Sequence, residues 1–213
     1  MGYLLPVLPG FPVNDAGVIR PRSDMPQPPN AQIIKKVERL SEIAEALRRG
    51  NKFHVTGLAT IKGLCGEPEA VAAFALFLAQ KIQKKMRQKK YPQTFRELVD
   101  RVIKELTPYL ADPTEERQAR LHSLCEEMRS EQKAYMKSGW NVGRMLKHGD
   151  LLLVEECVRS VLRRSEAPFW AYHAAKDYAV RYDAQYGFGL IPNSAPMVEE
   201  IAEFWRDYYG IKE

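Results

Sequence analysis

The sequence predicts an all-α protein: a single, bundle-like helical domain of seven to eight helices, preceded by an extended, proline-rich N-terminal arm. Apolar residues recur at helical spacing through most of the chain. No segment alternates apolar and polar residues over more than four positions, as a half-buried strand would. Seven of the fourteen prolines fall within residues 1–30. The chain shows no internal repeat at a fixed period, so the pattern does not indicate a solenoid.

Residues 1–30 are the expected arm. Proline fixes φ and removes a backbone donor, so we expect neither a helix nor a central strand there. The arm is nevertheless rich in apolar residues, which a solvated linker would not need. We therefore expect it to pack on its own domain, or to clasp a partner or a second copy of the chain. The apolar side chains that would make this contact include Leu5, Leu8 and Phe11.

Residues 31–213 are the expected helical domain, and its first helices fall within residues 31–90. Asn30 is expected to cap a helix that Gly50 terminates. A short helical piece spans residues 56–65. The sequence of residues 66–69 places a proline and two acidic residues where a helix begins, and the apolar stripe that follows runs to about Lys89.

The middle of the chain predicts two further helices. Thr94 and Glu97 have the spacing of a capping box, and Pro108 is expected to end the helix that they start. Residues 112–115 resemble a second helix start, and this helix is expected to end near Gly139.

Three helices are expected in the last third. Asp150 is the expected N-cap of a strongly apolar helix that closes at Arg164. Another helix is expected over residues 168–182, and the last runs from about Ser194 to Gly210.

The charge is distributed unevenly along the chain. The net charge is +5, but residues 31–109 hold sixteen Lys and Arg against eight Asp and Glu, a balance of +8. Residues 150–213 hold seven against eleven, a balance of −4. The basic portion would suit an acidic partner such as DNA or RNA. It would equally suit the acidic portion of the same chain or of a second copy.

The densest basic run lies near the end of the expected helix over residues 66–89. No Asp or Glu occurs between Ala70 and Arg96, so these cations could neutralise several phosphates. Alternatively, they stabilise the C-terminal end of the helix through its dipole. The candidate nucleic-acid-binding residues are Lys81, Lys84, Lys85, Arg87, Lys89 and Lys90, together with Arg48 and Arg49.

Aromatic residues gather at the C-terminus, where eleven of twenty-one fall within residues 167–213. Such a density builds either a core or an exposed contact surface. The glycine-containing connection over residues 186–192 either docks on its own helices or presents Phe188, Leu190 and Ile191 to a partner. A small-ligand pocket is a further alternative, with Tyr172, His173, Tyr178 and Trp205 as its expected lining.

The sequence contains no motif of a known chemistry. It lacks a phosphate-binding loop, a nucleophile elbow and a complete dinucleotide fingerprint, and its four histidines are scattered. We therefore assign no catalytic residue, metal site or cofactor. Three widely spaced cysteines are typical of a reducing cytoplasm, and no stretch reaches the length of a membrane span, so we expect no integral membrane association.

The functional expectation is a non-enzymatic helical interaction protein, an adaptor or assembly factor, whose partner is another protein or a second copy of itself. The alternative is a nucleic-acid-binding protein that uses the basic face of residues 31–109. An enzyme or ligand-binding protein built on the aromatic pocket is the third option.

Overall fold

The computed structural model describes residues 30–88, 90–139, 141–183 and 187–211. Within these ranges the chain forms seven α-helices, and the all-α prediction is confirmed. Side chains of residues 182–188 also lie outside the description.

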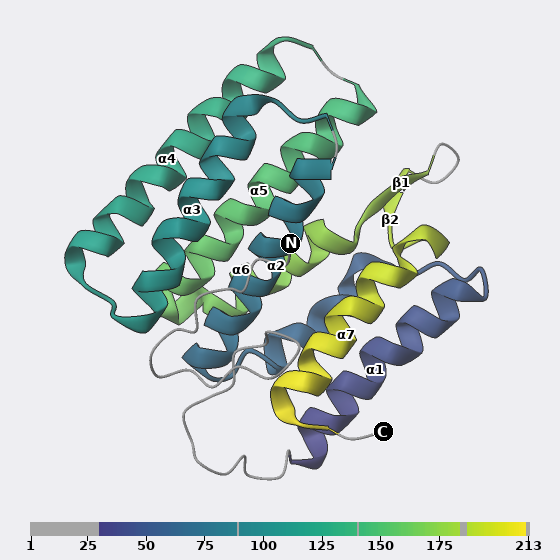
Figure 1. The fold of residues 1–213 in the computed structure, drawn as a ribbon. Coiled ribbons are helices and arrows are strands. Elements are labelled where there is room, and N and C mark those ends of the chain that lie inside the picture. Colours follow the sequence, from purple (N-terminus) through teal and green to yellow (C-terminus); the bar gives the residue numbers. More distant parts are fainter. Residues whose placement is uncertain (1–29, 89, 140, 184–186, 212–213) are drawn as a thin grey trace.

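Four long helices form an antiparallel bundle (Figure 1). They are α2 (Pro68–Gln88), α3 (Gln93–Ala111), α4 (Glu115–Lys137) and α5 (Val142–Leu162). Each packs on its neighbours in chain order, and α5 closes the bundle against α2. The short connections between successive helices enforce this antiparallel arrangement.

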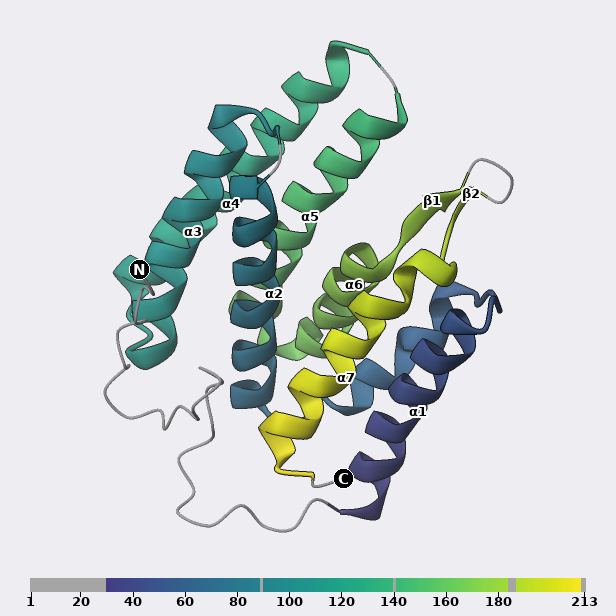
Figure 2. The ribbon, with the colours of Figure 1, turned by 45° about the vertical axis from the view of Figure 1, so that its right-hand side comes forward.

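A second group of elements packs beside the bundle. Helices α1 (Ala31–Arg48) and α7 (Ala195–Tyr209) lie side by side although they stand at opposite ends of the chain, as Figures 1 and 2 show. Helix α6 (Ala167–Ala179) packs on α2, α5 and the 3-10 helix η1 (Val55–Gly63), so it joins the two groups. Two shorter 3-10 turns, η2 (Arg164–Glu166) and η3 (Pro192–Ser194), precede α6 and α7.

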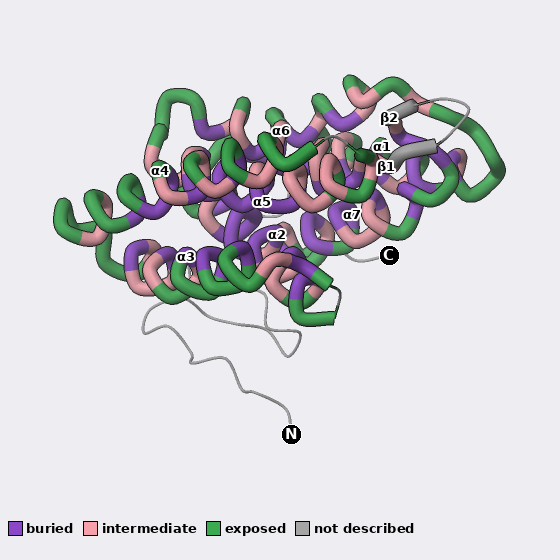
Figure 3. Tube along the Cα trace, turned by 90° about the horizontal axis from the view of Figure 1, so that it is seen from above, coloured by how far each residue is buried: buried purple, intermediate pink, exposed green. Residues whose placement is uncertain are grey.

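One continuous apolar core runs through both groups. Buried residues lie on the helix faces that oppose one another, and exposed residues lie outside (Figure 3). At the centre Trp205 of α7 is fully buried, and its ring centroid lies 4.8 Å from that of Phe74 on α2. Many of the C-terminal aromatic residues therefore build core, including Tyr178, Phe204, Trp205 and Tyr208.

A small hairpin follows α6. Strand β1 (Arg181–Asp183) pairs antiparallel with β2 (Gly187–Gly189), and Phe53 donates its N–H to the carbonyl of Leu190 at 3.0 Å. The expected helix over residues 168–182 therefore ends early, at Ala179. Tyr178 accordingly lies on α6, whereas Tyr182 belongs to β1.

Three expected helix boundaries also differ. Helix α5 begins at Val142, because the side chain of Asn141 caps it by accepting the N–H of Arg144 at 2.9 Å. Asp150 is therefore a buried residue inside α5 and not its cap. Helix α3 begins at Gln93 without a side-chain cap, so Thr94 does not form the expected capping box. It also continues past Pro108 to Ala111.

Candidate interaction surface

The start of α6 carries an exposed aromatic side chain. Phe169 is 45% exposed and packs edge-to-face on the half-buried Trp170, with ring centroids 5.2 Å apart. One turn later the ring of His173 lies 4.3 Å from that of Phe169. The inward side of α6 is instead made of small residues and Tyr172, which pack on the core, so Phe169 and Trp170 are turned outward.

Cationic side chains lie over the rings of Phe169, Trp170 and Tyr172. The Nζ of Lys62 on η1 lies 4.8 Å from the ring centroid of Tyr172 and 5.7 Å from that of Phe169. The guanidinium of Arg159 lies 4.5 Å above Trp170, and that of Arg163 lies at 5.9 Å. Such contacts attract because the face of an aromatic ring is negative. We call the six residues Lys62, Arg159, Arg163, Phe169, Trp170 and His173 the aromatic–cation surface.

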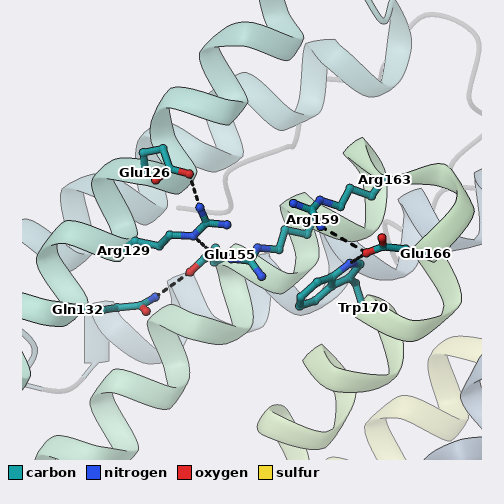
Figure 4. A network of polar contacts seen from close by, with 8 residues as sticks. All are labelled: Glu126, Arg129, Gln132, Glu155, Arg159, Arg163, Glu166 and Trp170. Carbon is teal, nitrogen blue, oxygen red and sulfur yellow. Dashed lines mark hydrogen bonds and ion pairs between the residues drawn. The ribbon is translucent and has the colours of Figure 1, made fainter.

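Glu166 fixes the orientation of Trp170. The indole Nε1 donates to Oε2 of Glu166 at 2.8 Å, and Arg163 reaches the same oxygen at 3.4 Å (Figure 4). These two contacts, that with Trp170 first, lower the pKa of the Glu166 carboxyl, which therefore stays ionised at neutral pH.

The buried carboxylate of Glu155 holds Arg159, one of the residues of the aromatic–cation surface. Glu155 of α5 is 1% exposed at its side chain and accepts from Arg129 Nε at 2.7 Å, from Gln132 at 3.3 Å and from Arg159. Because Arg159 also covers Trp170, a single arginine links the α4–α5 contact to this half-buried ring (Figure 4). The position of Trp170 is thus coupled to the bundle core.

The next residue of α5, Glu156, faces α6. Its side chain is 5% exposed, and its Oε1 lies 3.9 Å from Nδ1 of His173. Burial, and then the charge of Asp177, raise the pKa of Glu156, so it is a neutral acid at neutral pH. Burial, together with Lys176 and Lys62, lowers the pKa of His173, which favours its uncharged form. The positive charge of the aromatic–cation surface at neutral pH therefore comes from its arginines and lysine and not from His173.

A hollow of about 660 Å³ adjoins the surface. It opens where the connection between α3 and α4 meets the junction of α5 and α6. Arg163 and Glu166 line it and also belong to the Trp170 contacts. The remaining lining residues are Tyr109, Pro113, Gln118, Leu162, Arg164 and Ser165.

A different hollow, of about 470 Å³, lies between α3 and α4. Its walls are acidic, because four carboxylates face it with one arginine, Arg101. Arg101 pairs with Glu127 at 2.6 Å across the two helices. The other acidic lining residues are Glu97, Glu126 and Glu131.

Most of the expected nucleic-acid-binding residues on α2 have carboxylate partners. Lys81 pairs with Glu200 at 3.0 Å, Lys85 with the buried Asp150 at 2.6 Å, and Arg87 with Asp100 at 3.3 Å. Lys84 and Lys90 are exposed and contact no carboxylate within the described ranges. Lys89 lies outside the described residues.

The other two cations of the predicted set lie on and beside the last turn of α1. Arg48 contacts Glu45 at 3.1 Å and Glu199 of α7 at 3.2 Å, and Arg49 contacts Glu45 at 3.0 Å. Part of the basic portion thus pairs with the acidic C-terminal portion of the same chain, one of the alternatives that the sequence left open.

The predicted apolar contact residues are only partly described. Leu5, Leu8, Phe11 and the side chain of Phe188 lie outside the described residues. Leu190 is fully buried and Ile191 is 5% exposed. These two side chains pack inside their own domain, so they are not available to a partner in this structure.

The four residues of the expected pocket have different neighbours. Tyr172 and His173 lie together, with ring centroids 5.3 Å apart. Tyr178 instead donates to Glu200, and Trp205 is buried against Phe74. The structure therefore brings two of the four together and distributes the others over the core.

Sequence reasoning missed the aromatic–cation surface. Lys62 is far along the chain from Arg159 and Trp170, and Arg163 was interpreted only as a helix end. The available signal was the pair Phe169–Trp170 near a helix start, with Arg163 and Arg164 a few residues before it.

The described residues contain no group of three or more His, Cys, Asp or Glu that could hold a metal ion. No helix in the described part of the chain is both long and apolar enough to cross a membrane. Comparison with protein-family models, with curated proteins and with solved structures found no match.

Proposed function

We propose that this chain is a non-enzymatic helical interaction protein, an adaptor or assembly factor, that binds a protein partner or a second copy of itself through the aromatic–cation surface. The exposure of Phe169 carries the proposal. Among the described large apolar residues only Phe169 and Leu146 are exposed, at 45% and 36%.

The composition of the surface supports this role. Protein interfaces are enriched in aromatic residues and arginine, and a few such residues provide most of the binding energy. Fully burying an exposed phenylalanine contributes roughly 1.5–3 kcal/mol, and Phe169, which is 45% exposed, would contribute about half of that. The contacts between Trp170, Arg159 and Glu166 hold the surrounding rings in place before binding, which lowers the entropy cost of association.

The proposed function also involves the N-terminal arm and a cytoplasmic location. The apolar arm of residues 1–30 would supply a second contact with the partner. Three free, buried cysteines, Cys65, Cys125 and Cys157, support a reducing compartment such as the cytoplasm.

A photo-crosslinking amino acid at position 169 tests the proposed surface. We expect crosslinks to a second copy or to one defined protein in a cell extract. The same amino acid at position 146, the other exposed apolar site, is the matched control. Equal crosslinking from both positions, or none from 169, would contradict the proposal. Sedimentation velocity of the full chain over a hundredfold concentration range then separates self-association from binding to another protein.

Nucleic-acid binding through the basic face of residues 31–109 is the second candidate. Lys84 and Lys90 favour it, because both are exposed and pair with no carboxylate of the described residues. Replacing both with glutamine should weaken binding to labelled DNA or RNA and reduce the slope of log affinity against log salt by about two, one unit for each lysine. Lys85 is left intact because it pairs with buried Asp150. An unchanged slope would exclude this face.

A further inference from the structure

We infer that the hollow beside the aromatic–cation surface binds a phosphomonoester group on a peptide segment of the protein partner, a phosphoserine or phosphothreonine, while Phe169 contacts an apolar side chain of the same segment. This inference rests on the proposed function, because the occupant is part of the partner that the adaptor would bind.

The lining of the hollow suits a phosphate. Arg163 and Arg164 are both exposed, and Arg164 makes no ion pair with any residue that the structure describes. Guanidinium groups bind phosphate oxygens with paired, charge-assisted hydrogen bonds. The Ser165 hydroxyl and the Gln118 amide add uncharged donors to the same walls.

The carboxylate of Glu166 competes with a phosphate for Arg163. Glu166 lines it and holds Arg163 at 3.4 Å, with side-chain exposures of 51% and 49%. Exposed ion pairs of this kind are weak, so a dianionic phosphate can displace the carboxylate from Arg163. Removing the charge of Glu166 should therefore strengthen phosphate binding. A purely structural role for the two arginines would not produce such a gain.

The exposed Phe169 ring near the hollow indicates that the phosphate is carried by a peptide with an apolar side chain. Arg163 lines the hollow and also lies 5.9 Å from the Trp170 ring, which packs on Phe169. Arg163 in the hollow is thus connected to the exposed Phe169 ring through Trp170. An extended peptide advances about 3.3 Å per residue, so a phosphorylated residue and an apolar residue a few positions away can occupy both at once.

Two observations favour a peptide over a nucleic-acid strand. Stacking of successive bases needs a series of free ring faces. Here Arg159 already covers Trp170 at 4.5 Å, which leaves Phe169 as the exposed aromatic ring of the described surface. The separate hollow between α3 and α4 is lined by four carboxylates, Glu97, Glu126, Glu127 and Glu131, and one arginine, Arg101. It would repel a strand that reached it.

The test uses the full chain and a fluorescein-labelled peptide library with a central phosphoserine, a phenylalanine two positions later and mixed residues elsewhere. The same library without phosphate is the reference. Fluorescence anisotropy should show about tenfold tighter binding of the phosphorylated form. An NMR titration with phenyl phosphate should shift the backbone amide signals of Arg163, Arg164 and Ser165.

Three variants give the residue-level test. Arg164→Gln, whose side chain makes no described ion pair, should remove most of the preference for the phosphorylated library, and Arg163→Gln/Arg164→Gln should remove all of it. Glu166→Gln should increase the preference. Arg101→Gln, an exposed arginine on α3, is the matched control and should leave the preference unchanged. Circular dichroism melting checks that each variant is folded.

Other outcomes of these experiments would overturn the phosphate site, its peptide ligand or the proposed function. Equal binding of both libraries, or an unchanged preference in Arg164→Gln, would overturn the phosphate site. Tighter binding of a twelve-nucleotide oligouridine, lost in the double arginine variant, would replace the peptide with single-stranded RNA. If crosslinks from position 169 persist while the phosphate preference is absent, only this inference fails. If both are absent, the proposed function fails with it.

Discussion

The ammonium of Lys85 lies 2.6 Å from Oδ1 of Asp150, and this ion pair joins α2 to α5 inside the bundle. The Asp150 side chain is only 5% exposed, and its second oxygen accepts the hydroxyl proton of Tyr91. Burial, followed by the charge of Asp150, raises the pKa of Tyr91, so its phenol remains a donor through the physiological range. Lys85 is therefore half-buried, and its charge is paired within the bundle.

Replacing Asp150 with asparagine should destabilise the fold. The change removes the charge that pairs with the Lys85 ammonium and accepts the Tyr91 hydroxyl proton, at a carboxylate only 5% exposed, and hydrogen bonds to a charged group contribute about 1.5–3 kcal/mol each. Urea denaturation followed by circular dichroism measures the loss. Asp100→Asn is the control, since Asp100 pairs with Arg87 at a site 51% exposed, and its change should stay within about 1 kcal/mol. Similar losses in both variants would mean that the buried Asp150 pair contributes no more to the unfolding free energy than the exposed Asp100 pair.

The helices could be predicted from sequence because their information is local. Apolar spacing identified the inner face of α1, where Val37, Leu40, Ala44 and Leu47 are all buried. Boundaries were less certain because several residues can serve as caps. Asn141 and Asp150 both suit an N-cap, and the sequence favoured Asp150 because a strongly apolar run follows it directly.

The candidate surface could not be predicted, because its geometry depends on tertiary packing. Nothing near Lys62 in the sequence indicates that it lies over Tyr172, since α6 and η1 meet only in the folded chain. Likewise the pairing of Lys81 with Glu200 joins residues 119 positions apart. Charge counts along the sequence showed that basic and acidic portions exist, but not which cations remain unpaired.

Among the polar residues that hold Arg159 and Trp170 in place, Glu155 should be the one whose replacement lowers the unfolding free energy most. Glu155→Gln leaves Arg129 and Arg159 facing a neutral amide, at a position 1% exposed, and we expect a loss of about 3 kcal/mol or more in unfolding free energy. Glu126→Gln removes another carboxylate contact of the same Arg129 at a position 68% exposed, and should change stability by less than about 1 kcal/mol. Equal effects would argue against a buried anchor.

The coupling between Glu155 and Trp170 can be observed by fluorescence. Because Arg159 bridges the two, Glu155→Gln should also increase the mobility of the Trp170 indole, seen as a lower steady-state anisotropy of its emission. The measurement needs a background in which Trp140 and Trp205 are replaced by phenylalanine. An unchanged anisotropy would show that Trp170 is held by Glu166 alone.

Trp205 should respond differently to two substitutions. Trp205→Ala opens a cavity in the core against Phe74 and should cost about 3–5 kcal/mol. Trp205→Phe keeps most of the ring and removes a buried indole N–H that has no hydrogen-bond partner among the described residues. Its cost should therefore stay below about 1.5 kcal/mol. Thermal or urea unfolding distinguishes the two, and comparable losses would indicate an unrecognised partner for the N–H.

Glu156 should make stability fall as the pH rises. Burial, and then Asp177, raise its pKa in the folded protein, whereas the unfolded chain has the ordinary value near 4.5. The folded state therefore binds the proton more tightly, and its contribution is complete below about pH 4.5 and is lost as pH climbs toward the raised pKa. Lys176 and Arg159 oppose the shift by favouring the charged form.

Glu156→Gln isolates this effect, because glutamine is neutral at every pH and similar in size. The variant should be more stable than the natural chain at pH 8 by roughly 1–3 kcal/mol, and the difference should shrink toward pH 5. Urea denaturation at half-unit steps between pH 5 and pH 8.5 gives both curves. Glu203→Gln, on the exposed side of α7, serves as the control with a constant offset. A difference between Glu156→Gln and the natural chain that is independent of pH would mean that Glu156 is ionised in the folded protein.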